Sequence, residues 1–98
     1  MIMNRNTILK LLTEHQAVLI SRYGVRRLGL FGSYTRGQQN KTSDIDILAS
    51  FSKEIDLFDF IDLREYLESC LQAKVDLVME TALKPAIAKH ILAEVEYV

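Results

Sequence analysis

The sequence predicts an α/β fold in which a small mixed β-sheet is packed with helices. Segments whose apolar residues recur at helical spacing alternate along the chain with short, mostly apolar segments that are typical of strands. The length and composition agree, because 98 residues, of which 49% are hydrophobic and 26% charged, suffice for one core. We therefore expect residues 1–98 to form a single domain.

The first half of the chain predicts a helix, a strand and a polar loop. The helix runs from about residue 6 to residue 22, and Gly24 stands where a helix C-terminal glycine would. His15 lies on the apolar face of this helix, so we interpret it as a packed structural residue rather than a ligand. Residues Val25–Phe31 predict a strand, and residues 34–43 predict a helical turn and then a loop.

The second half repeats the alternation of strand and helix. A second strand is predicted over Asp44–Phe51, a helix over about Leu57–Gln72 and a third strand over Val75–Met79. A last helix begins near Pro85, since the fixed φ of proline suits the first helical position. The alternating residues 95–98 predict a short edge strand.

Composition argues against several classes of function. With 12 basic and 13 acidic residues the formal net charge is −1, so the chain lacks the positive field that nucleic-acid binding requires, and we expect no direct nucleic-acid partner. Cys70 is the only cysteine, which excludes an internal disulfide. Because no segment has the pattern of a signal peptide and the apolar runs are too short to span a bilayer, we expect a cytoplasmic protein without a membrane partner.

Two aspartates in the second predicted strand are the first candidates for chemistry. Asp44 and Asp46 share one face of the strand, whereas Ile45 and Ile47 share the other, because strand side chains alternate. At a rise of roughly 3.3 Å per residue the two aspartates lie about 7 Å apart, close enough for both to reach hard cations such as Mg²⁺. If the third strand neighbours the second, Asp76 completes a cluster of three carboxylates that divalent metal would neutralise. The alternative is that the first two are solvated and that Asp76 caps a strand end.

A Gly-Ser pair supplies a second candidate element. Gly32 and Ser33 directly follow the first predicted strand, where backbone N–H groups and a hydroxyl can hold phosphate oxygens and glycine permits close approach of the anion. Taken alone, such a pair is a common turn dipeptide. Followed by an Asp-x-Asp strand, it becomes a specific signal.

The combined string carries a family resemblance. Gly32-Ser33-Tyr34-Thr35-Arg36-Gly37, followed by Ser43-Asp44-Ile45-Asp46-Ile47-Leu48, resembles the signature of the polymerase-beta-like nucleotidyltransferase superfamily. Asp76 matches the third carboxylate of that family. The segment from Leu83-Lys84-Pro85 to the terminal Tyr97-Val98 resembles the minimal nucleotidyltransferase branch, which includes the antitoxins of HEPN/MNT toxin–antitoxin pairs.

The resemblance implies a magnesium-dependent nucleotidyl transfer, with two ions and with ATP as co-substrate. In that reading Asp44, Asp46 and Asp76 are catalytic residues and metal ligands, and Asp76 also holds or deprotonates the incoming hydroxyl. Gly32 and Ser33 would grip the triphosphate. Arg36 matches the Arg-Gly pair of the family and would contact phosphate or the acceptor, although a solvated loop arginine is the alternative.

For the acceptor, the resemblance favours a protein. The chain would be the antitoxin of a type VII-like system, transferring AMP from ATP to a tyrosine of a partner HEPN ribonuclease toxin and releasing pyrophosphate. A hetero-oligomer with that toxin is then expected. Two alternatives remain: a small-molecule nucleotidyltransferase similar to those that modify aminoglycosides, and a subunit that neutralises the toxin by binding without catalysis.

Overall fold

A four-stranded sheet forms the centre of the computed structural model, which describes residues 4–40 and 43–98. The strand order is β3-β2-β1-β4. β1 (Val25–Phe31) is antiparallel to β2 (Ile45–Phe51) and to β4 (Glu96–Tyr97), whereas β2 is parallel to β3 (Val75–Met79). The predicted α/β class with a mixed sheet is therefore confirmed.

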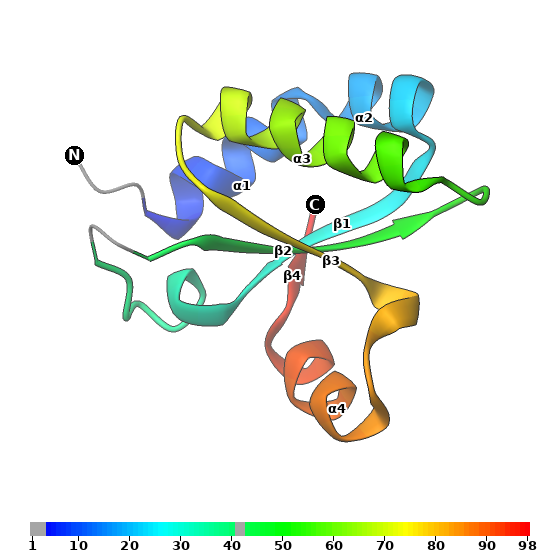
Figure 1. The fold of residues 1–98 in the computed structure, drawn as a ribbon. Coiled ribbons are helices and arrows are strands. Elements are labelled where there is room, and N and C mark those ends of the chain that lie inside the picture. The colour runs from blue at the N-terminus through cyan, green and yellow to red at the C-terminus, as the bar shows by residue number, and fades with distance from the viewer. Residues whose placement is uncertain (1–3, 41–42) are drawn as a thin grey trace.

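The helices lie on the two sides of this sheet (Figure 1). α1 (Arg5–Glu14), α2 (Gln16–Tyr23) and α3 (Leu57–Leu71) form a layer on one side, and α4 (Pro85–Glu94) lies on the other. Two short 3-10 turns, η1 (Gly32–Tyr34) and η2 (Glu80–Ala82), follow β1 and β3. No helix within the described residues is both long and apolar enough to cross a membrane.

The hydrophobic core fills the space between the sheet and the layer of three helices. Its fully buried side chains come from both sides: Ile8, Leu12, Leu19, Leu63, Leu67 and Leu71 from the helices, and Leu28, Leu30, Ile45 and Ile47 from the strands. Burial of large aliphatic side chains is the main stabilising term for a chain of this size. The sheet is thereby fixed as a rigid support for residues at its edges.

The first predicted helix is in fact two helices, which corrects that prediction. The backbone breaks at His15 (φ −95°, ψ 5°), and α2 starts at the next residue. The His15 ring packs edge-on against Tyr66, and its Nδ1 lies 2.8 Å from the Tyr66 hydroxyl, which confirms a packed structural histidine. Helical apolar spacing continues across the break, so periodicity alone gives no sign of it. Gly24 ends α2 in the left-handed conformation, as predicted (φ 68°).

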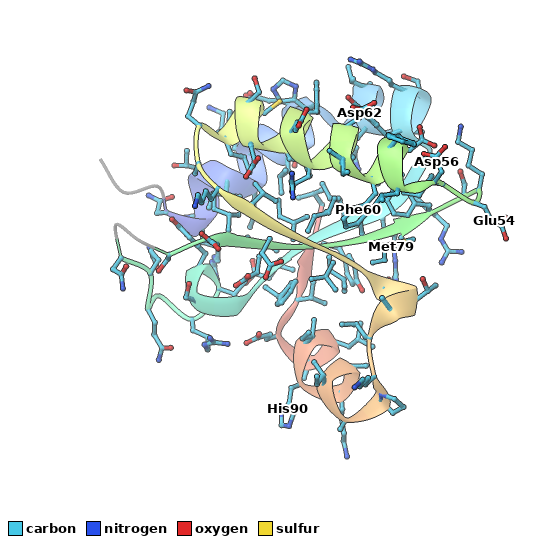
Figure 2. The ribbon with its side chains drawn as sticks, in the orientation of Figure 1. Glu54, Asp56, Phe60, Asp62, Met79 and His90 are labelled. Carbon is cyan, nitrogen blue, oxygen red and sulfur yellow. The ribbon has the colours of Figure 1, made fainter. Side chains whose placement is uncertain are left out.

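α4 differs from the other helices because none of its residues is buried. Pro85 is its first residue, as the sequence predicts. His90 is exposed and points away from the sheet in Figure 2. The helix therefore depends for its position on its ends, one of which continues into β4 beside β1.

An apolar groove of about 390 Å³ lies between the start of α3 and the end of β3. Phe60 and Met79 are among its lining residues and are labelled in Figure 2. The groove lies by Met79, the last residue of β3, whereas Asp76 lies near the first residue of that strand. It is therefore separate from the acidic residues described next.

Candidate active site

The sheet brings the predicted motif residues to one edge. β1 runs antiparallel to β2, so its last residue, Phe31, pairs with Asp46 near the start of β2. β2 runs parallel to β3, so Asp46 also pairs with Asp76. Gly32 follows Phe31 directly. Elements far apart in the sequence thus meet because of the directions of three neighbouring strands.

The acidic residues differ in their exposure. Asp46 is half-buried, while Asp44 and Asp76 are exposed. Asp44 lies immediately before β2. The observed strand therefore starts one residue later than the predicted strand, which began at Asp44. The register confirms that the second and third predicted strands are neighbours. This pairing is the condition under which the sequence predicts that Asp76 lies near Asp44 and Asp46.

The environment of Asp46 raises the pKa of its carboxyl group from 3.8 to about 6. Burial is the largest cause, because it penalises the charged form. Asp76 adds to the rise through its charge and a hydrogen bond, and Asp44 adds through its charge, whereas the charge of Arg36 opposes them. Mutual repulsion among these carboxylates is therefore present at this edge.

These carboxylates suit a hard divalent cation by donor type and charge. Over residues 4–40 and 43–98, no three acidic, histidine or cysteine side chains are grouped so as to hold a metal ion as they stand. Asp46 and Asp76 nevertheless pair across adjacent strands, and a divalent cation bound there would offset the repulsion that adds to burial in raising the pKa of Asp46. The oxygen donors of Asp46 and Asp76 therefore fit a hard cation such as Mg²⁺.

Gly32 stands where the chain must pass close to Asp46. Its backbone is left-handed (φ 81°), and a Cβ at this position would collide with the Asp46 carboxylate. Both features require glycine. The turn is held by Thr35, whose hydroxyl donates to the Gly32 carbonyl at 2.7 Å.

Ser33 and Arg36 lie in the same turn and the loop after it. Ser33 is half-buried, and its carbonyl accepts the N–H of Gln38 at 2.9 Å. The Arg36 guanidinium donates through Nε to the Gln38 side-chain oxygen at 3.2 Å. Tyr34, buried between them, anchors the turn in the core. Gly32, Ser33 and Arg36 thus lie close together in one short turn and the loop after it.

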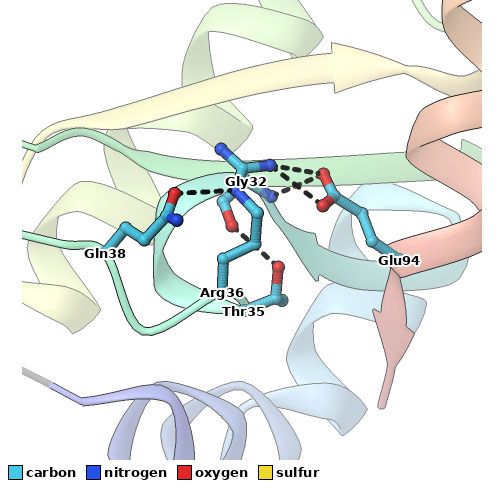
Figure 3. A network of polar contacts seen from close by, with 5 residues as sticks. All are labelled: Gly32, Thr35, Arg36, Gln38 and Glu94. Atoms are coloured by element: carbon cyan, nitrogen blue, oxygen red, sulfur yellow. Dashed lines mark hydrogen bonds and ion pairs between the residues drawn. The ribbon is translucent and has the colours of Figure 1, made fainter.

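A residue that the sequence did not single out completes this network. The Glu94 carboxylate, at the end of α4, accepts the Gly32 N–H at 3.2 Å and pairs with Arg36 Nη1 at 2.9 and 3.2 Å (Figure 3). Arg36 is therefore an ion-paired residue here and not merely a solvated loop arginine. Glu94 lies 62 positions from Gly32 and follows no motif, so no signal in the sequence marked it.

Comparison with known proteins identifies the family. A family model described as "Nucleotidyltransferase domain" matches residues 12–98. The chain belongs to this nucleotidyltransferase family. The nucleotidyltransferase is also 51% identical to the protein adenylyltransferase MntA of Thermococcus cleftensis, over 90% of this chain and 89% of that relative.

Solved structures give the same result for the fold. A minimal nucleotidyltransferase superposes with a TM-score of 0.76 at 33% identity, covering 96% of this chain and 95% of that one. A toxin–antitoxin structure with AMP-PNP has a TM-score of 0.70 at 29% identity, covering 97% and 72%. A tri-AMPylated HEPN toxin of Shewanella oneidensis in complex with its MNT antitoxin gives 0.60 at 26% identity, covering 94% and 66%. The minimal nucleotidyltransferase inferred from the motifs is confirmed.

Proposed function

We propose that this nucleotidyltransferase is a protein adenylyltransferase that transfers AMP from ATP to a tyrosine of a HEPN-family toxin and thereby acts as its antitoxin. The observation that carries the proposal is the juxtaposition of Gly32 with Asp46 and Asp76 at one edge of the sheet. Such a site places hydrogen-bond donors for phosphate oxygens next to paired carboxylates. A relative of the chain is named for adenylyl transfer, and a solved structure with the same fold is a complex with a HEPN toxin.

The chemistry is an in-line displacement at the α-phosphorus of ATP. The tyrosine oxygen forms a bond to this phosphorus, the bond to the β-phosphate oxygen breaks, and pyrophosphate leaves. Asp76 is exposed beside Asp46 and would accept the phenolic proton. The Gly32 N–H, the Ser33 hydroxyl and Arg36 would orient the triphosphate, since backbone donors and a guanidinium are the usual partners of phosphate oxygens.

Asp44, Asp46 and Asp76 would hold Mg²⁺, as the pair of ions that such carboxylate sites use.

 When bound there, the metal supplies charge neutralisation and Lewis acidity at the phosphate oxygens. Every other step rests on the chain's own residues, which bind the triphosphate, orient the α-phosphorus and accept the proton.

A macromolecular acceptor agrees with the architecture. The acidic edge lies on the surface of a four-stranded sheet, with Asp44 and Asp76 exposed. A large partner can approach such an open site and supply the wall that encloses the reacting atoms. The expected cytoplasmic location stays a prediction.

The experiment is the intact mass of the adjacent gene's product after co-expression with the nucleotidyltransferase. With the wild type we expect that product to gain one or more AMP units, and fragment masses then locate them on tyrosine. With Asp44→Ala/Asp46→Ala we expect no gain, because the metal ligands are lost.

The matched control is Asp62→Ala/Glu65→Ala, which removes the same charge from two exposed positions of α3 and should leave the modification intact. If the mass of the co-purifying partner never changes, the chain neutralises by binding and the adenylyl-transfer proposal fails. If AMP is found on a residue other than tyrosine, only the proposed acceptor is wrong.

A further inference from the structure

We propose that Glu94 is an internal anion that competes with the ATP triphosphate for the phosphate-binding turn and so sets the nucleotide affinity of the site. The identity of the competing ligand rests on the proposed function. The hydrogen bonds that carry the inference do not, because they are made within the chain.

The contacts of Glu94 are those of a bound anion. One carboxylate oxygen accepts the Gly32 N–H at 3.2 Å, and both oxygens accept Arg36 Nη1, at 2.9 and 3.2 Å. The backbone N–H of a glycine and a guanidinium are donors that also bind phosphate oxygens. The carboxylate thus takes the position that the proposed function gives to phosphate.

The two ligands exclude each other at this turn. The Gly32 amide has a single hydrogen, and its close approach to Asp46 leaves the turn little freedom to present it elsewhere. A triphosphate oxygen and the Glu94 carboxylate also repel each other as like charges. Binding of the triphosphate to Gly32 and Arg36 therefore requires Glu94 to leave.

The cost of that departure is moderate. The Glu94 side chain is 27% exposed and the Arg36 side chain is 50% exposed, so water solvates both groups when they separate. α4 has no buried residue, and its last turn can therefore shift without opening the core. Glu94 lowers the affinity for nucleotide without abolishing binding.

The test measures binding of Mg²⁺-AMP-PNP by isothermal titration calorimetry. Glu94→Gln should bind roughly three- to tenfold more tightly than the wild type, as expected for removing one half-exposed ion pair and weakening one hydrogen bond. Glu94→Asp should also bind more tightly, since its shorter side chain keeps the charge but withdraws from the turn. The control is Glu96→Gln, which removes the same charge two residues further along the chain. The Glu96 carboxylate pairs with Arg5 at 2.9 Å, and the nucleotide affinity of this variant should match that of the wild type.

Equal or weaker binding by Glu94→Gln overturns the inference. So does tighter binding by Glu94→Gln when Glu94→Asp matches the wild type, because the effect is then one of overall charge and not of the contact. Thermal melting of each variant verifies the fold, and Glu94→Asp serves alone if Glu94→Gln does not fold.

A second titration separates the inference from the proposed function. Mg²⁺-tripolyphosphate carries the phosphates without the nucleoside, and the same ranking of variants is expected. If tripolyphosphate binds with that ranking while AMP-PNP does not bind, the competition stands and the adenylyl-transfer proposal fails. If AMP-PNP binds but the affinities of the variants follow another order, only the proposed competition by Glu94 fails. If the wild type binds neither probe, the competition and the adenylyl-transfer proposal both fail.

Discussion

Replacing Asp46 by asparagine should stabilise the folded chain at pH 8 in the absence of divalent metal. The pKa of the Asp46 carboxyl is raised from 3.8 to about 6, by burial first and then by Asp76 and Asp44. At pH 8 the native protein must therefore keep an unfavourable charge. Asparagine has the same shape without that charge, and its amide can donate to Asp76.

The sign and the size follow from linkage. Between about pH 4 and pH 6 the native state holds a proton on Asp46 that the unfolded chain has lost, so this group's contribution to stability falls as pH rises through that window and is constant above it. At about 1.4 kcal/mol for each pH unit the upper limit is about 3 kcal/mol. Solvent screening at a half-buried carboxylate reduces the expected gain for Asp46→Asn to about 1–2 kcal/mol.

The assay is urea unfolding of the wild type and Asp46→Asn in EDTA at pH 8 and near pH 4. At pH 8 we expect Asp46→Asn to have the higher free energy of unfolding. Near pH 4 we expect the two proteins to have the same free energy of unfolding. Asp62→Asn, an exposed change on α3, is the control and should show no difference at either pH. A variant less stable than the wild type at pH 8 would refute the account of repulsion at this edge.

Four further outcomes are expected. Gly32→Ala should lower AMP transfer by about 100-fold in the mass assay while circular dichroism stays native, because its Cβ would displace the Asp46 carboxylate; near-normal transfer would show that the close approach is dispensable. Ile47→Ala should lower the free energy of unfolding by about 2–5 kcal/mol in urea, since this side chain is fully buried. A smaller loss would mean that neighbouring side chains move in to fill the cavity. Asp56→Ala should cost about 1 kcal/mol by thermal melting, because the Asp59 N–H loses its 2.8 Å cap at the start of α3; an unchanged melting temperature would contradict this. Removing Mg²⁺ with EDTA should weaken AMP-PNP binding by at least about tenfold in calorimetry, or about 1.4 kcal/mol, and equal affinity would contradict a metal-bridged triphosphate.

The parts of the fold that the sequence predicts are those with strong local patterns. The strand at Val25–Phe31 is observed with the predicted bounds, and so is the one at Val75–Met79. The helix at 57–71 ends one residue before the predicted end, because Gln72 takes a left-handed conformation. The break at His15 was not predictable, since it preserves the apolar period on both sides.

The candidate site divides in the same way. Gly32 and Asp46 share a motif of short sequence separation, and their proximity follows from two adjacent antiparallel strands. Asp76 was predictable only on the condition that β3 pairs with β2, which the register satisfies. The contact of Glu94 with Arg36 depends on how α4 returns over the sheet, and that is a tertiary property without a local signature.

Charge explains why this edge suits a metal-bound nucleotide. Asp44, Asp46, Asp76 and Glu94 place four carboxyl groups around one turn, against a single nearby guanidinium from Arg36 in the described contacts. A bare triphosphate would add further negative charge to an edge that already raises the pKa of one of its own acids. Divalent cations on the aspartates would reverse the sign of that edge, and displacement of Glu94 would free the donors of the turn. The two changes act on different groups, so metal and triphosphate should bind more tightly together than either does alone.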